Sequence, residues 1–466
     1  MNPIAPVFFV YLGIIAWLFQ RRTQWLTRFG VFTVLLGGLF VSYGVAVPFS
    51  DGVNPTLTYI AISPERLADY YVAVFMAYAG IYLGMWALDV LRTGRERTQV
   101  GTVAATDVLA VGAALIIAIV FIAWIVIPWT DFVQGISSFL PGHSAADYRL
   151  HRIQYGAQTT NFGSAFGYIG SFTRFALAPV MLWILFFHRK RSRLLSAMFW
   201  LLFAILLVIG LLSGQKQPAL LLIVGFAVAL LIQRGRPSIL SWRLAAVALV
   251  LVGVVAPTLY LAQYPTLDFA AAIQLTLYRL TEEPSRVAQL RFIFYPDIHP
   301  YLNGLSSYIL RGFATLLGID TNAAQSPETY IPASSPGVGP NYGGTWNAGF
   351  FADAWADFGF VGVTAGSFAV GFLVRAIDRW YSASGKGAVE MGVYTAVCIS
   401  ALYVSEVGTL TALWTYGLGS AFLMYFLLKL LRFERKPLET LVPLNPRWTG
   451  VPQGSSHTDP KPLSPR

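Results

Sequence analysis

Residues 194–212 read LLSAMFWLLFAILLVIGLL, a run without a charged side chain. As an α-helix this run would be about 28 Å long, close to the roughly 30 Å of hydrocarbon in a bilayer. A helix also satisfies its backbone N–H and C=O groups within the segment, which lipid cannot do for it. The stretch therefore predicts a helix that crosses a membrane.

Apolar runs of this kind recur along most of the 466 residues, of which 56% are hydrophobic and 12% charged. A soluble domain needs more polar surface than this, and the alternating short segments of a β-barrel are absent. The sequence predicts an all-α polytopic membrane protein with about eleven transmembrane helices. We place them near residues 4–19, 29–48, 70–91, 107–128, 167–187, 194–212, 218–233, 244–262, 357–377, 388–407 and 409–431.

The predicted spans form one membrane domain, residues 1–436, with large outer connections at 129–166 and 263–346. The longer connection is too apolar to be disordered, so we expect it to contain short helices at the membrane surface. Residues 437–466 are rich in Pro and Ser, which predicts a disordered cytoplasmic tail. The single cysteine, Cys398, falls within a span, which excludes a disulfide framework.

Basic residues gather in every second connection between the predicted spans. These connections lie near residues 21–28, 92–97, 189–193, 234–243, 375–386 and 429–436. Because Lys and Arg near helix ends favour the cytoplasm, the alternation predicts an N-terminus outside and a C-terminus inside. The net charge of +10 then reflects topology and not nucleic-acid binding.

Two carboxylates stand where the long connection meets the next span, in NYGGTWNAGFFADAWADFGFVG (341–362). A spacing of four places Asp353 and Asp357 on one helical face. Acids in a first turn can simply compensate the helix dipole. Two like charges at the edge of a low-dielectric bundle, however, need a partner, and outer-loop arginines are available. Both interpretations stay open, as does the role of Gly359, Gly362 and Gly366 in close packing against a neighbouring helix.

Cations on the predicted outer side are the second group of candidate site residues. A cation at head-group level suits a phosphate, whereas the alternative is a side chain that solvates a surface helix or extends to water. A cation inside a span is costly and is usually paired or functional. The candidates are Lys216 in SGQKQP (213–218), Arg279, Arg286, Arg291 and Arg311 of the long connection, Arg152 of the shorter one, and Arg174 within the fifth span.

Three short motifs together resemble the Wzy-type oligosaccharide repeat-unit (O-antigen) polymerases. They are LLSGQKQPALLLIVG (211–225), YLNGLSSYI (301–309) within an arginine-rich outer loop, and ADAWADFGFVG (352–362). Arg152, followed after ten residues by Gly163, is similar to a spacing noted in polysaccharide polymerases. Lys216 stands where the family commonly has an arginine.

The resemblance implies a GT-C-like glycosyltransferase in the bacterial inner (plasma) membrane. Such enzymes move a growing glycan from undecaprenyl diphosphate onto the sugar of another lipid-linked unit at the outer face. Asp357 or Asp353 would act as the base or hold arginines, and the cations would stabilise the leaving diphosphate. Membrane lipids, a chain-length regulator and a flippase are the implied partners. No metal or cofactor is implied, and HExxH, GxxxxGK[ST] and Asp-x-Asp patterns are absent from the chain.

Three alternatives remain open at this point. An O-antigen ligase would perform the same chemistry on a lipid A core. A glycan or lipid transporter would have broken helices and polar groups at mid-membrane, together with internal repeats. A structural partner in an envelope assembly would tolerate neutralisation of the outer arginines.

The orientation is testable with a reporter that is active only outside the cytoplasm. Fused after Arg435, the reporter is expected to be inactive, because the segment that follows the last predicted span is basic and should lie in the cytoplasm. Fused within the 263–346 connection, it is expected to be active. Activity after Arg435 would overturn the predicted orientation.

Overall fold

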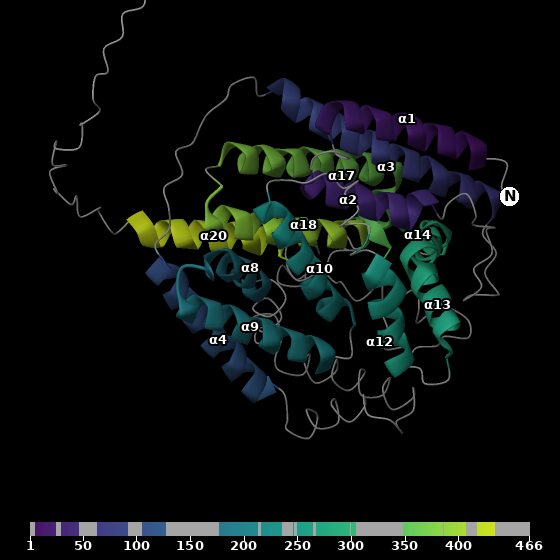
Figure 1. Cartoon of the computed structure of the whole chain (residues 1–466). Coiled ribbons are helices and arrows are strands. Elements are labelled where there is room, and N and C mark those ends of the chain that lie inside the picture. The colour runs from purple at the N-terminus through teal and green to yellow at the C-terminus, as the bar shows by residue number, and fades with distance from the viewer. Residues whose placement is uncertain are drawn as a thin grey trace, which may run out of the picture.

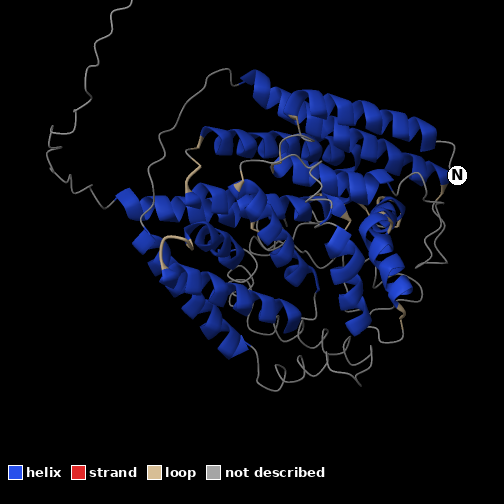
Figure 2. Ribbon diagram, viewed as in Figure 1, coloured by secondary structure: helices blue, strands red, loops and turns tan. Residues whose placement is uncertain are grey.

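The computed structural model describes residues 5–24, 29–45, 63–91, 105–126, 177–212, 216–234, 246, 249–263, 267–298, 300–303, 348–384, 386–406 and 417–433. All regular elements within these ranges are helices (Figure 2). Four are long and apolar enough to cross a membrane, at Pro64–Leu91, Arg193–Gly210, Gly349–Ala383 and Ala388–Ser405. The described part of the chain is that of an all-α membrane protein.

The helices follow the predicted spans closely. The N-terminal elements are α1 (Ala5–Thr23), α2 (Val31–Leu39), the π-helix η1 (Phe40–Val45), α3 (Pro64–Leu91), α4 (Ala105–Val126), α8 (Ala178–His188) and α9 (Arg193–Leu212). The later elements are α10 (Lys216–Gln233), the π-helix η4 (Leu251–Val255), α12 (Ala256–Gln263), α13 (Phe269–Thr281), α14 (Glu283–Phe294), α17 (Gly349–Ala383), α18 (Ala388–Glu406) and α20 (Leu418–Phe433). Each predicted span overlaps at least one helix, and α13 and α14 are short helices within the long connection.

Several predicted segments fall outside the described residues. They are the connection 129–166, the beginning of the fifth span at 167–176, residues 304–347 of the long connection, residues 409–416 of the last span, and the tail 437–466.

Helices α3 and α17 form the most extensive contact between described helices (Figure 1). Gly84 of α3 lies so close to α17 that a Cβ atom there would overlap the carbonyl oxygen of Phe368. On the facing side, a Cβ atom at Gly371 would overlap the carbonyl oxygen of Ile81. Lipid supplies no hydrophobic drive between helices, so this backbone approach is a main source of attraction.

The sequence suggested Gly359, Gly362 and Gly366 for such an approach, and these positions were wrong, since Gly359 meets the Tyr301 side chain and not a neighbouring helix. Gly362 packs against the carbonyl oxygen of Ala354 in its own helix, and Gly366 meets only the Ala354 Cβ at 3.6 Å. The reason is a break in α17 at Gly359. Because of this break, Gly362 and Gly366 face Ala354, which precedes the break in the same helix.

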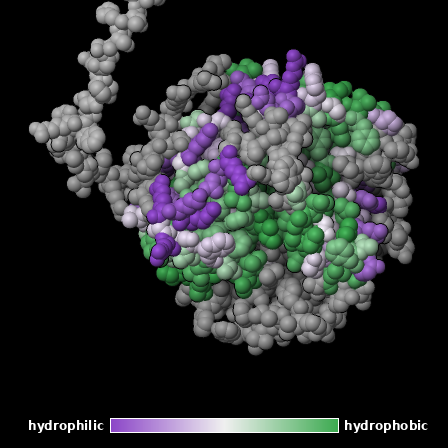
Figure 3. Space-filling view, viewed as in Figure 1, coloured by the Kyte–Doolittle hydropathy of each residue, from purple (hydrophilic) through white to green (hydrophobic). Residues whose placement is uncertain are grey.

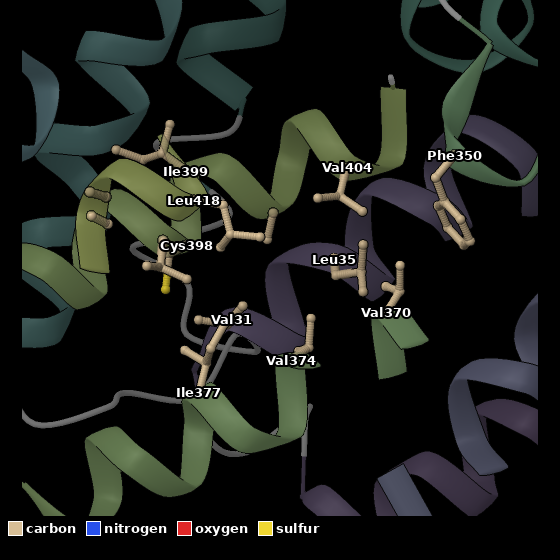
Figure 4. Packing of buried hydrophobic residues seen from close by; sticks show 14 of the residues in the cluster. Val31, Leu35, Phe350, Val370, Val374, Ile377, Cys398, Ile399, Val404 and Leu418 are labelled. Carbon is tan, nitrogen blue, oxygen red and sulfur yellow. The ribbon is translucent and has the colours of Figure 1, made fainter. Parts of the chain in front are cut away.

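Helix α2 packs against both α17 and α18. Figure 4 shows Val31 and Leu35 of α2 beside Val374 and Ile377 of α17, with Val404 of α18 on the other side. All of these side chains are buried. This apolar helix positions its neighbours through packing, and its Val31 N–H also donates to the Tyr394 hydroxyl of α18 at 3.1 Å.

Charged groups are separated toward the ends of the bundle. Arg22 of α1 and Arg375 of α17 both bind Asp89 at the end of α3, so the three helices run in the same direction. At the opposite end, Arg66 Nε donates to Asp297 Oδ2 at 2.7 Å. Figure 3 shows hydrophilic side chains at the left and right of this face, with a hydrophobic belt between them.

The close approach of α3 and α17 gives a stability prediction. Gly84→Ala should lower the free energy of unfolding by about 1–3 kcal/mol, because the new methyl group must displace backbone. Gly37→Ala in α2 is the matched control, since a Cβ there meets nothing within 4 Å. The control should be neutral or stabilising by up to about 1 kcal/mol. Thermal unfolding of the purified proteins measures both, and equal effects would contradict the close approach.

Candidate functional site

A buried ion pair joins α14 to α17 beside the predicted carboxylates. Arg291 Nε lies 3.5 Å from Asp353 Oδ1, and the two side chains are 0% and 8% exposed. Arg291 lies in the last turn of α14, and Asp353 lies in the buried N-terminal part of α17. Charges withdrawn from water are tolerated when they are paired, so this contact fixes how the two helices meet.

The helix-dipole interpretation does not account for the two acids. Helix α17 begins at Gly349 and has no acidic residue in its first turn. Asp353 and Asp357 lie further along and are both buried. The effect of the dipole falls off beyond the first turn, so the contact with Arg291 is the better explanation for Asp353.

Helix α17 is broken at Gly359, directly after the second carboxylate. Gly359 has φ +60° and ψ −144°, a conformation that is essentially restricted to glycine. The backbone N–H groups of Leu302 and Asn303 donate to the carbonyl oxygens of Ala356 and Asp357, at 3.0 and 3.1 Å. The segment that follows α14 thus supplies donors that a continuous helix would supply itself.

The break places Asp357 at a boundary. Asp357 is buried, whereas the next residue, Phe358, is 50% exposed. Tyr301 covers the break, since a Cβ at Gly359 would lie 2.9 Å from its hydroxyl oxygen. A carboxylate therefore stands between a packed interior and an exposed aromatic side chain.

Aromatic side chains that sequence reasoning did not single out support this region. The rings of Trp355 and Phe292 stack with centroids 4.4 Å apart. Trp355 Nε1 donates to the carbonyl oxygen of Tyr295 at 3.0 Å. In the sequence, the position of Trp355 between Asp353 and Asp357 was the signal that could have identified it. The Tyr70 hydroxyl lies 2.7 Å from Ser285 Oγ. Because Tyr70 lies in a long apolar helix, no sequence pattern distinguished it.

The other described arginines of the long connection make local pairs. Arg286 binds Glu282 at 2.9 Å and Arg279 binds Glu283 at 3.3 Å, each across one helical turn. Burial raises the pKa of the Glu283 carboxyl, and Arg279 opposes this shift. The Arg279 side chain is 48% exposed, so its guanidinium group can reach a ligand from solution.

A further ion pair tethers the segment after α14 to the beginning of α3. The hydrogen bonds that Arg66 donates hold the pKa of Asp297 below its usual value. This contact joins two parts of the chain on the side of the bundle that carries Asp357.

The side chains of the remaining predicted cations lie outside the described part of the structure. Lys216 is the first residue of α10. Arg152, Arg174 and Arg311 lie outside the described residues. Among the residues that the structure describes, no group of three or more His, Cys, Asp or Glu side chains could hold a metal ion.

The geometry separates the roles of the two acids. Asp353 is engaged by the wholly buried Arg291, which makes this pair a positioning device. Asp357 lies at the break, one residue from an exposed surface, and is the better placed of the two to accept a proton from a ligand.

Comparison of the chain with protein-family models, with curated proteins and with solved structures gave no match. The likeness of the short motifs to Wzy-type polymerases is therefore an expectation that the geometry has to support.

The buried pair gives a second stability prediction. Arg291→Met leaves the Asp353 carboxylate buried without this partner and should cost about 3–5 kcal/mol of unfolding free energy. Arg291→Met combined with Asp353→Asn should cost less than the sum of the single changes, by about 0.5–3 kcal/mol. Thermal or denaturant unfolding in detergent measures these values.

The pair of the exposed Arg279 and the partly buried Glu283 is the control for this cycle, since both side chains are far more accessible than those of Arg291 and Asp353. Its single changes should each cost at most about 1 kcal/mol. Additive effects at Arg291 and Asp353, or effects as small as those of the control, would show that the buried pair does not join the two helices.

Proposed function

We propose that the protein transfers a glycan from a lipid diphosphate to the sugar of a second lipid-linked unit, as Wzy-type polymerases do. The observation that supports this most is the buried pair of Arg291 and Asp353 beside the break in α17. Asp353 and the break lie in the same short stretch, residues 352–362, that resembles the family. A charged pair that positions a second carboxylate at a boundary suits acid–base chemistry.

The position of the break favours an enzyme over a transporter. Residues 360–383 of α17 would be about 36 Å long, which exceeds the roughly 30 Å of hydrocarbon. The break therefore falls near one membrane face. A transporter is expected to place its broken helices near the midplane. The described charges also lie toward the ends of the bundle, as the contacts of Asp89 and Arg66 illustrate.

The proposed reaction follows from the chemistry of the donor. The acceptor hydroxyl oxygen forms a bond to the anomeric carbon of the donor glycan, and the bond from that carbon to the diphosphate breaks. Asp357 accepts the hydroxyl proton, and the diphosphate leaves with the electron pair. Guanidinium groups such as that of Arg279 stabilise the charge on the diphosphate, with Lys216 as a further candidate. Arg291 holds Asp353 and acts through the packing around Asp357.

The proposal includes the finer features of the sequence prediction. These are about eleven spans in a GT-C-like arrangement, an outer location for the break in α17, and a bacterial inner membrane with the C-terminus in the cytoplasm. A chain-length regulator and a flippase are the expected protein partners. The lipid-linked glycan is the substrate class, and the same chemistry would serve an O-antigen ligase.

The test uses the purified protein and its native lipid-linked glycan, with product length read on a gel. Asp357→Asn should reduce the rate about 10²–10⁴-fold, because an amide is a far poorer base than a carboxylate. Asp268→Asn is the control. Asp268 caps α13 by accepting from the Ala271 N–H at 2.7 Å, and Asn keeps that bond.

The outcomes separate the alternatives. Normal activity of Asp357→Asn at wild-type thermal stability would remove this residue from the reaction. Transfer only to a lipid A core would identify a ligase. Absence of either product with the wild-type protein would overturn the proposed reaction.

A further inference from the structure

At the end of the bundle opposite the break, two helices bring three arginines to one carboxylate on a third helix. Asp89 Oδ2 lies 2.8 Å from Arg22 Nε, and Asp89 Oδ1 lies 2.8 Å from Arg375 Nε and 2.7 Å from Arg379 Nη2. The three arginines come from α1 and α17, and Asp89 lies near the end of α3. We call Asp89 and these three arginines the Asp89 cluster.

The Asp89 cluster carries more positive than negative charge. Its three guanidinium groups exceed the single carboxylate by two. Another acid, Asp378 of α17, accepts a hydrogen bond from the Tyr394 hydroxyl on the side of α18. Arg21, next to Arg22 on α1, lies over the Trp17 ring at 5.2 Å and adds a further positive charge. The guanidinium groups are reachable, because the side chains of Arg22, Arg375 and Arg379 are 22%, 23% and 32% exposed.

Exposed apolar side chains flank the cluster. On α3, Trp86, Val90 and Leu91 are exposed on either side of Asp89. On α1, Trp17 is exposed one turn before Arg21. Tryptophan is enriched at the boundary between hydrocarbon and head groups, which places the cluster at the level of lipid phosphates. Cations at that level beside an apolar surface match both parts of a phospholipid.

We infer that the Asp89 cluster binds the head group of an anionic phospholipid, whose acyl chains lie along the exposed apolar side chains of α1 and α3. The excess positive charge selects an anionic head group over a zwitterionic one. Arginine suits this role because its planar fork can bind two phosphate oxygens while another N–H group remains on the carboxylate. The lipid would join the ends of α1, α3 and α17.

Removal of one arginine tests the site without removing every partner of Asp89. Arg379→Gln deletes the most exposed of the three cations and leaves Arg22 and Arg375 on the carboxylate. Lys190→Gln is the control with the same change of charge. Lys190 is exposed in the connection between α8 and α9.

The purified full chain is titrated with phosphatidylglycerol or phosphatidylcholine of identical acyl chains, and bound lipid is counted by native mass spectrometry. The wild-type protein should bind phosphatidylglycerol more tightly. Arg379→Gln should reduce that preference about fivefold, the change expected for one arginine near an anionic surface. Lys190→Gln should retain the preference. Circular dichroism and size exclusion confirm that each variant is folded.

Three results would overturn the inference. The first is equal binding of the two lipids by the wild-type protein. The second is an equal loss of preference in Arg379→Gln and Lys190→Gln, which would indicate a general effect of the basic end. The third is displacement of phosphatidylglycerol by inorganic phosphate at matched concentration, which would indicate a site for a soluble anion. None of these results depends on the glycan-transfer activity.

Discussion

The structure depends on one constraint, which is that charge placed among apolar helices must find a partner. Arg291 is wholly buried, and its contact with Asp353 joins α14, a helix within the long connection, to α17, the longest of the described helices. An uncompensated charge in this setting costs several kcal/mol. The pair therefore restricts how α14 and α17 can pack, and the stacking of Phe292 on Trp355 follows from the same alignment.

Helix α17 combines two requirements that conflict in an ordinary helix. The part after Gly359 must lie against α3 so closely that Gly84 of α3 and Gly371 of α17 each face a backbone carbonyl oxygen of the other helix. The part before Gly359 must turn so that Asp353 reaches Arg291. The positive φ of Gly359 permits that turn, and the N–H groups of Leu302 and Asn303 satisfy the carbonyl oxygens at the break.

Charge is used differently at the two ends of the bundle. Near the break, Arg291 pairs with Asp353, and Asp357 lies beside the exposed Phe358. At the other end, a single carboxylate gathers three arginines and leaves a positive excess. The proposed glycan-lipid donor and the inferred phospholipid would share one physical basis, which is the attraction of a phosphate group to arginine side chains.

The sequence by itself determined the helical class and the position of each described membrane helix. It also led to the expectation that Asp353 needs an arginine of the long connection as its partner. Hydropathy and charge alternation are local along the chain, so they can be followed without a structure. Only the tertiary structure decided that the arginine is Arg291, that α17 breaks at Gly359, and that Asp89 collects arginines from two other helices. Asp89 and Arg375 are 286 positions apart, and no local pattern specifies which distant side chains the packing of helices will bring together.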